Sequence, residues 1–262
     1  MSVERLPTIF FGHGSPMNAI EDNEFSRTWA NMAANLPKPR AILCVSAHWL
    51  TEESKVTAMA KPKTIHDFGG FPRELYAVEY PALGDPALAV ETVDALLPTK
   101  TKLDIEWGLD HGTWSVLRRV YPAADVPIVQ LGIDYSQGAR YHYEMGCRLK
   151  VLRERGVLVI GSGNLVHNLA KIAWDKMNED DYAYDWAREM NDTFKSLVAE
   201  KKDEQLIDYE KFGKNGRLAI PTPDHYFPFL YILGARDKDE PYTVFNDKAF
   251  AGSLTMTSFT FG

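Results

Sequence analysis

Several short segments of this chain are apolar at every position, and longer stretches with helical periodicity separate them. A strand that is apolar throughout must be covered on both faces, whereas a half-solvated strand alternates apolar and polar residues. The expected strands are residues 7–11, 41–46, 56–60, 126–131 and 157–160. The expected helices are residues 24–35, 86–97, 114–121, 137–155 and 182–200. This order predicts a three-layer α/β domain with helices on both faces of a largely parallel or mixed central sheet.

The C-terminal end has a different pattern. Residues 242–245 and 253–261 alternate, which predicts antiparallel edge strands. No internal repeat or long linker divides the chain, so one domain over residues 1–262 is expected. Residues 61–80 are rich in proline and glycine, and a loop of that length is often functional. The charged stretch 175–210 is interpreted as a solvated helical face.

Composition argues for a small-molecule ligand. The net charge is −7, and no basic run or stripe occurs, which argues against a nucleic-acid partner and against an anionic membrane surface. No apolar segment approaches the roughly 18 residues of a membrane span, and no secretory signal is recognised. The two cysteines, Cys44 in an apolar run and Cys147, form no CxxC pair and imply no disulfide framework. A cytoplasmic location is therefore expected.

Three histidines each follow an apolar strand. His13, His48 and His167 come just after the segments 9–11, 43–46 and 159–162. In open α/β sheets, ligands bind in the crevice beyond the carboxyl ends of the strands. One such histidine would be unremarkable, but three together favour convergence on one site.

Two of the candidate histidines are expected near helix N-termini. Thr222 could cap a helix that carries His225 in its first turn, and Asn164 could cap one that carries His167. The positive end of a helix disfavours a protonated imidazole, and the neutral ring is the form that binds metal or accepts a proton.

The other three histidines are weighed separately. His111 lies between glycines ahead of a helix, and His66 lies in the long loop, so both are candidates for a pocket. His142 lies mid-helix among residues that look exposed, and is interpreted as structural or solvated.

The motifs of several common enzyme classes are absent. The chain has no dinucleotide or P-loop glycine motif, no GxSxG elbow and no HExxH. Ser15 lies close to His13, but neighbouring loop positions seldom give nucleophile–base geometry, so a serine hydrolase is a weak reading. Dispersed histidines fit a mononuclear metal site better, and iron(II), zinc and manganese all remain possible ions.

Six segments, in order over nearly the whole chain, resemble the DODA-type extradiol aromatic ring-opening dioxygenases of the LigB-like class III superfamily. They are GHGSP at 12–16, SAHW at 46–49, HDFGGFP at 66–72, LDHGTW at 109–114, GSGNLVHN at 161–168 and TPDHY at 222–226. The resemblance implies one LigB-like catalytic domain over residues 1–262.

The resemblance also implies roles for individual residues. It assigns a single divalent metal ion to His13, His48 and His225, an acid/base role to His167, and a place near the substrate to His111. Better-known members of the superfamily use two histidines and a glutamate. The third imidazole here makes the site one charge more positive, which suits Zn²⁺ as well as Fe²⁺.

The implied substrates are a catechol and O₂, with DOPA cleaved between carbons 4 and 5 to a seco-DOPA semialdehyde. The residues expected to contact the substrate are His66, Phe71 and Tyr226. Two alternatives stay open at this point. One is a zinc hydrolase in which His167 activates water on the metal, and the other is a non-catalytic binding protein on the same scaffold. The sequence does not indicate an oligomeric state.

Overall fold

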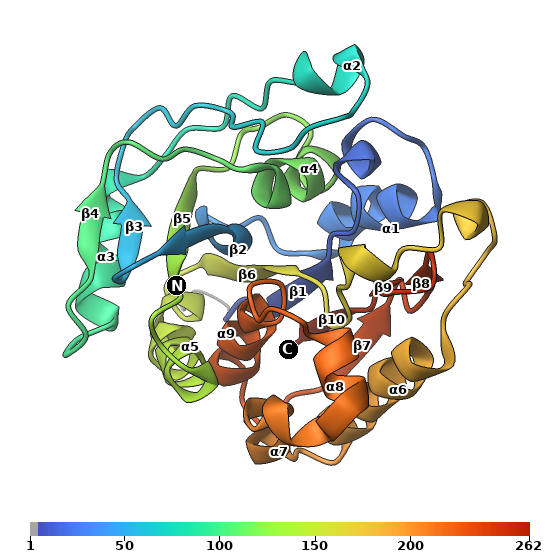
Figure 1. Cartoon of the computed structure of the whole chain (residues 1–262). Helices are drawn as coiled ribbons and strands as arrows, with labels where there is room; N and C mark the ends of the chain where they lie inside the picture. The colour runs from blue at the N-terminus through green and yellow to red at the C-terminus, as the bar shows by residue number, and fades with distance from the viewer. Residues whose placement is uncertain (1–4) are drawn as a thin grey trace.

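A computed structural model describes residues 5–262, and an eight-stranded mixed sheet forms its centre (Figure 1). The strand order is β4-β3-β5-β2-β6-β1-β10-β7. The four central strands run parallel, whereas β3 is antiparallel to β5, and β10 is antiparallel to both β1 and β7. The strands are β1 (Thr8–Gly12), β2 (Ala41–Thr51), β3 (Lys55–Thr57), β4 (Lys102–Asp104), β5 (Ile128–Asp134), β6 (Val157–Gly163), β7 (Tyr242–Phe245) and β10 (Ser258–Phe261). A separate two-stranded sheet pairs β8 (Ala249–Phe250) with β9 (Leu254–Thr255).

Helices cover both faces of the large sheet, so the predicted three-layer architecture is confirmed (Figure 1). Helices α1 and α4 lie on one face, and α3, α5, α6 and α9 lie on the other. The helices are α1 (Glu24–Met32), α2 (Arg73–Tyr76), α3 (Pro86–Ala95), α4 (His111–Val120), α5 (Ala139–Arg153), α6 (Asp185–Ala199), α7 (Asp203–Ile207), α8 (Gly213–Ala219) and α9 (Phe227–Ala235). The 3₁₀ turns are η1 (Pro16–Ala19), η2 (Ala33–Asn35), η3 (Leu169–Lys171), η4 (Trp174–Lys176) and η5 (Tyr209–Phe212).

The central strands are apolar throughout because each contributes side chains to two hydrophobic cores, one on each face of the sheet. Leu43 and Val45 of β2 pack with α5 and α9, whereas Ile42 and Cys44 pack with α4 on the opposite face. Every residue of β1, β5 and β6 is buried. Successive side chains of a strand point to opposite faces, so a strand between two helix layers has no position that can be polar without a partner.

Helix α9 is buried along its whole length, from Phe227 to Ala235. A helix that is hydrophobic on all sides belongs in the interior. Its close contact with α5 depends on Gly146 and Gly234, where an added Cβ would lie 2.1 Å from the carbonyl oxygens of Tyr231 and Tyr143, respectively. The turn that leads into α9 is held at the end of β6 by a hydrogen bond from the Asn164 backbone amide to the His225 carbonyl.

Two predicted helix starts are wrong. Residues 164–168 form a loop whose His167 makes an isolated bridge to Leu254, and the Asn164 amide donates to the Thr255 carbonyl instead of capping a helix. His225 lies in the turn before α9, whose N-cap is Tyr226, and not in a helix capped by Thr222. In both places the backbone is fixed by contacts with distant segments, which override local capping signals.

Other expected element boundaries differ from the observed ones by a few residues. The strand expected at 126–131 is β5, which ends at Asp134, and the one expected at 56–60 is the shorter β3. Strand β4 was not predicted, and the expected strand 253–261 is divided into β9 and β10. Helix α4 begins at His111 because the Asp110 carboxylate caps it by accepting from the Thr113 amide. Within residues 5–262, no helix has the length and apolarity needed to cross a bilayer.

Candidate metal centre

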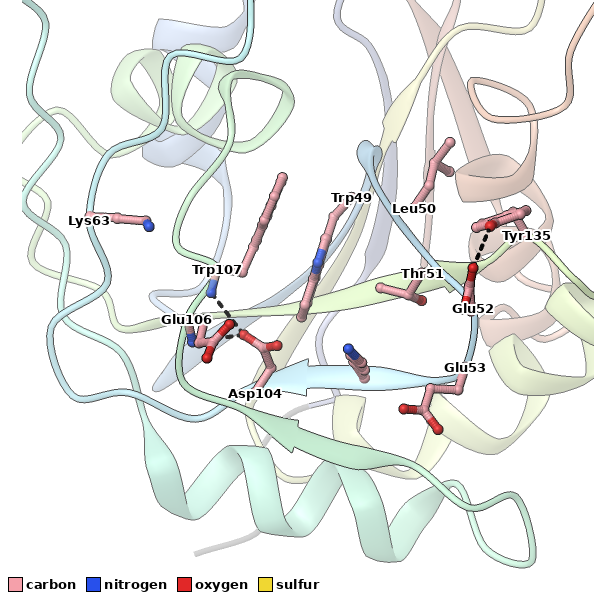
Figure 2. Close-up of a pocket in the computed structure, with 11 residues that line it drawn as sticks. Trp49, Leu50, Thr51, Glu52, Glu53, Lys63, Asp104, Glu106, Trp107 and Tyr135 are labelled. Carbon is pink, nitrogen blue, oxygen red and sulfur yellow. Dashed lines mark hydrogen bonds between the residues drawn. The ribbon is translucent and has the colours of Figure 1, made fainter.

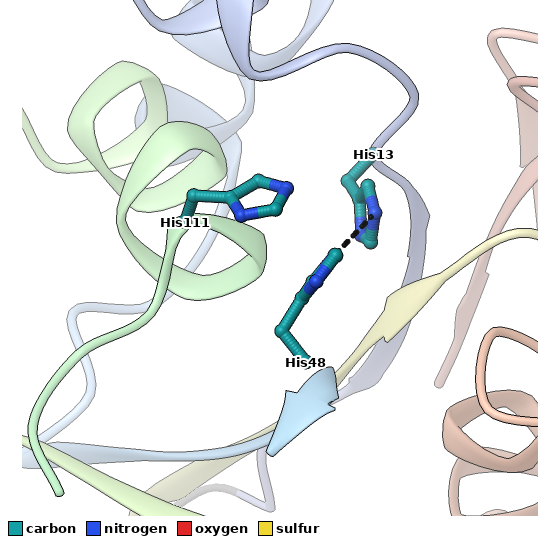
Figure 3. A group of neighbouring side chains, drawn as sticks. All are labelled: His13, His48 and His111. Atoms are coloured by element: carbon teal, nitrogen blue, oxygen red, sulfur yellow. Dashed lines mark hydrogen bonds between the residues drawn. The ribbon is translucent and has the colours of Figure 1, made fainter. Parts of the chain in front are cut away.

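The carboxyl ends of β2, β6 and β1 lie side by side, and the site is built at this edge of the sheet. His48 lies near the end of β2, His13 directly follows β1, and His167 follows β6. His111 opens α4, and Figure 3 shows it facing His13 and His48 across a short gap. His225 reaches the same place from the turn before α9, so all five imidazoles line one cavity.

Three of these rings are evenly spaced. The ring centroids of His13, His48 and His225 are separated by 5.1, 5.2 and 5.1 Å. Imidazoles that bind one tetrahedral ion through nitrogens about 2.1 Å away have centroids roughly 5 Å apart. The Nε2 atoms of His13 and His48 lie 3.2 Å apart, close to the roughly 3.4 Å between two nitrogen ligands of such an ion (Figure 3). The spacing therefore fits a shared cation.

The opposite nitrogen of each of these rings has an oxygen partner. Nδ1 of His13 is 2.9 Å from the Ser162 hydroxyl, and Nδ1 of His48 is 3.3 Å from Asp67 Oδ2. Nδ1 of His225 is hydrogen-bonded to the Asp224 carboxylate. Ligating histidines characteristically engage their second nitrogen in this way, which fixes the ring and leaves Nε2 for the metal.

The remaining two histidines each lie closer to a neighbouring ring than the evenly spaced three lie to one another. His111 lies 3.8 Å from His48 between centroids, and His167 is stacked on His225 at 3.5 Å with an interplanar angle of 6°. Potential ligand atoms also gather within 4.8 Å of one another in two groups, His13 with His48 and His111, and His167 with Asp224 and His225. The evenly spaced set takes two members from the first group and one from the second.

Burial keeps several of these imidazoles neutral. It is the main cause that lowers the pKa of His13 and of His48 well below the usual range, and the neighbouring imidazoles add to the effect. Burial also lowers the pKa of His167 to about 2, with His225 contributing. Burial would raise the pKa of Asp224, but the hydrogen bond and charge of His225 outweigh it and hold that pKa below its ordinary value. A neutral imidazole beside an ionised carboxylate is suited to binding a cation or accepting a proton.

The cavity in front of the histidines has a volume of about 450 Å³ and a largely apolar wall. The long loop 61–80 supplies Phe68 and Phe71 to this wall, which confirms that the loop takes part in a pocket. The other apolar side chains of the lining are those of Pro16, Leu169, Ile172, Trp174, Met177, Phe250 and Leu254. A hollow of this size accommodates one substituted aromatic ring.

Two residues expected to contact substrate lie elsewhere. Tyr226 is 1% exposed, its hydroxyl donates to the Leu206 carbonyl, and its ring packs against Phe194 in the core. His66 lies behind Phe68 and donates from Nε2 to the Val78 carbonyl, without lining the cavity. The prediction that Tyr226 and His66 contact the substrate is therefore corrected. Each adjoins a residue of the site in sequence, but its own side chain does not line the cavity. Phe71 does line the cavity.

The sequence reasoning also missed one residue. Asp67 accepts from the His111 amide at 2.9 Å, and its second oxygen lies 3.0 Å from His111 Nδ1 and 3.3 Å from His48 Nδ1. Its signals in the sequence were its place beside His66 in the long loop and its membership of the HDFGGFP segment at 66–72.

A second hollow lies at the edge of the sheet, over β3 and β4, where Trp49 and Trp107 are stacked 5.7 Å apart (Figure 2). None of its lining residues is a histidine, and three of its four carboxylates, those of Glu52, Glu53 and Asp104, have partners within the fold. Asp104 accepts from the Trp107 amide, and Glu53 pairs with Lys102. This hollow offers no comparable ligand set.

Comparison with known proteins decides the family. Residues 7–261 match the family described as the catalytic LigB subunit of aromatic ring-opening dioxygenase. The chain belongs to this family. It is therefore an aromatic ring-opening dioxygenase, as the sequence resemblance predicted, and the hydrolase and binding-protein readings give way to that activity.

Individual LigB-family relatives extend over the full chain. A protein of Escherichia coli K12 named 4,5-DOPA dioxygenase extradiol is 48% identical, covering 100% of this chain and 97% of its own length. A Beta vulgaris protein of the same name is 33% identical, with 97% and 96% covered. The crystal structure of an uncharacterized Escherichia coli K12 protein matches with a TM-score of 0.85 and 43% identity, covering 98% of this chain and 100% of the other.

Proposed function

We propose that this LigB-family chain cleaves DOPA between carbons 4 and 5 by extradiol chemistry, with one divalent metal ion held by His13, His48 and His225. The observation that carries the proposal is the even spacing of these three rings, 5.1–5.2 Å between centroids, at the base of an apolar cavity. The names of the full-length Escherichia coli and Beta vulgaris relatives support the substrate.

Three imidazoles form a donor set that suits either Zn²⁺ or Fe²⁺. When bound, the ion would supply a positive charge that favours the deprotonated catechol, together with redox chemistry if it is iron. The ionised carboxylates Asp67 and Asp224, which contact His48 and His225, offset the charge of the site.

The protein's own side chains perform the remaining work. Phe68 and Phe71 line the cavity, where their rings can pack on the aromatic substrate and exclude water from it. His167 is neutral at pH 7 and accepts a proton from a catechol hydroxyl, and the same ring later returns the proton to oxygen. His111, anchored by Asp67, is placed to donate a hydrogen bond to substrate or dioxygen.

The overall reaction balances without an added reductant. The ring carbon–carbon bond beside the hydroxyl at carbon 4 breaks, and both atoms of O₂ enter the product. One oxygen completes a carboxyl group at carbon 4, and the other forms an aldehyde at carbon 5. The ring is oxidised and dioxygen is reduced, which leaves a seco-DOPA semialdehyde acid.

The test loads the purified protein anaerobically with Fe²⁺ or Zn²⁺, adds DOPA and then admits air. Equimolar oxygen uptake with a yellow ring-opened product is expected for the competent metal, and mass spectrometry of that product identifies the bond that was cut. His142→Phe, a change at a residue that does not line the cavity, is the control and should retain activity. No oxygen uptake with either metal would contradict the proposal, as would turnover of esters or amides with Zn²⁺ alone.

We also propose that the chain is one catalytic domain over residues 1–262 that works in the cytoplasm. The family match over residues 7–261 supports the single domain. Two free cysteines support a reducing compartment.

A further inference from the structure

We propose that Ser162 is a positioning residue that determines which nitrogen of His13 carries the proton, and so prepares His13 to bind metal. Ser162 lies in β6, fully buried, one residue before the strand ends. Its hydroxyl oxygen is 2.9 Å from His13 Nδ1 and 2.5 Å from the carbonyl oxygen of Gly112. The inference rests on the proposed metal site.

The direction of these two hydrogen bonds follows from counting protons. The Gly112 carbonyl can only accept, so the single hydroxyl proton of Ser162 points toward it. Toward His13, Ser162 can then only accept. His13 must therefore carry its proton on Nδ1, which leaves the lone pair of Nε2 directed into the cavity.

The orientation of the Ser162 hydroxyl is itself held by the fold. Gly112 is in the first turn of α4, which Asp110 caps at Thr113. Ser162 and Gly112 are both buried, so bulk water does not compete for the hydroxyl proton. The same helix turn thus presents His111 to the cavity and fixes the proton on His13.

Ser162 differs in one respect from the oxygen partners of the other two proposed ligands. Asp67 and Asp224 are carboxylates, which accept a hydrogen bond whatever surrounds them. A serine hydroxyl can donate or accept, so it specifies a tautomer only because Gly112 takes its proton. Through this arrangement His13 is oriented without a further negative charge in the site.

The first test uses the unaltered protein. In metal-free wild type at pH 7.5, nitrogen-15 NMR of the histidine rings should show His13 in the form protonated at Nδ1. A proton on Nε2 of His13 would overturn the proposal, and this measurement does not depend on a variant that folds.

The second test measures Zn²⁺ affinity by competition with a chelator. Ser162→Ala should weaken binding by roughly 10–100-fold, the usual cost of losing such a partner, and Ser162→Thr should restore most of it. Ser115→Ala is the matched control, because Ser115 is also buried but its hydroxyl has no partner within the described residues.

The possible outcomes separate the two proposals. Wild-type affinity in Ser162→Ala, or an equal loss in Ser115→Ala, would overturn the role of Ser162. Failure of the wild-type protein to bind Zn²⁺ or Fe²⁺ through His13 would instead overturn the proposed function, whatever tautomer the NMR spectrum shows.

Discussion

Burial is the main determinant of the charge of His142, which lies outside the candidate metal centre. Its side chain is completely buried, its ring lies 4.1 Å from that of Phe227, and Nδ1 is 3.1 Å from the Tyr231 hydroxyl. Burial lowers the pKa of His142 to about 4. The structural role considered from the sequence is confirmed, whereas the solvated alternative is wrong.

The first prediction concerns the pH dependence of stability. An unfolded histidine has a pKa of about 6.5, so between about pH 6.5 and pH 4 the unfolded chain binds a proton at position 142 that the folded chain does not. The stabilising contribution of the neutral His142 ring is therefore complete above about pH 6.5 and declines as the pH falls from 6.5 to 4. His142→Phe should reduce the slope of unfolding free energy against pH by about 1.4 kcal/mol per pH unit. Urea unfolding at several pH values, with a chelator present, measures this slope for both proteins. Equal slopes in wild type and His142→Phe would contradict the prediction.

The second prediction separates metal ligands from the acid/base residue. His48→Ala should lose bound metal, because His48 lies 5.1 Å from both of the other proposed ligands between ring centroids. His167→Ala should keep metal but turn over ~10²–10⁴-fold more slowly, the usual loss when a positioned proton-transfer group is removed. Metal content by atomic spectroscopy and oxygen uptake distinguish the two. Loss of metal from His167→Ala would show that the role assigned to His167 is wrong.

Within a single element, the first turn of α4 packs so closely against His48 that it holds a glycine where helix propensity would favour alanine. Gly112 lies in this turn, and an added Cβ there would come within 2.5 Å of Ser46 Oγ and 2.8 Å of His48 Cδ2. Alanine is intrinsically the better helix former by about 1 kcal/mol. The close contact with His48 therefore decides the effect of a substitution at this position.

The third prediction is that Gly112→Ala destabilises the protein by about 1–3 kcal/mol, the usual cost of overpacking, and weakens metal binding by displacing His48. Gly69→Ala, in the long loop, is the control, because an added Cβ would meet nothing within 4 Å. Urea unfolding and chelator competition measure the two effects. A gain in stability in Gly112→Ala together with unchanged metal affinity would contradict the prediction. It would mean that the added methyl group is accommodated without displacing His48.

At the scale of the whole molecule, the proposed ligands tie together parts of the chain that are far apart in sequence. His13 follows the first strand, His48 is in the second, and His225 precedes the last helix. A metal ion held by all three would bind the folded chain and not the separated segments of the unfolded one. Binding of that kind raises the free energy of unfolding.

The fourth prediction is that Zn²⁺ at 100 times its dissociation constant stabilises the protein by about 2.7 kcal/mol. In a chain of this length that corresponds to a rise in Tm of roughly 5–10 °C. Thermal unfolding with Zn²⁺ and with excess chelator measures it. His13→Ala should show no rise, and an equal rise in that variant would place the stabilising ion elsewhere.

The layered architecture and much of the position of the site follow from local patterns in the amino-acid sequence. Segments such as 41–46 must be apolar at every position because helices cover both of their faces. His13 and His48 could be expected together because their strands, β1 and β2, both run parallel to β6 between them, and the carboxyl ends of parallel strands meet at one edge of the sheet.

The residues that support those histidines, in contrast, are brought to them by the packing of distant segments. Ser162 is 149 positions from His13, and Asp67 reaches both His48 and His111 from a loop with no periodicity. Tyr226 adjoins His225 in sequence yet points into the core. Local patterns report which face of an element is buried, whereas hydrogen bonds between distant segments depend on how those elements pack against one another.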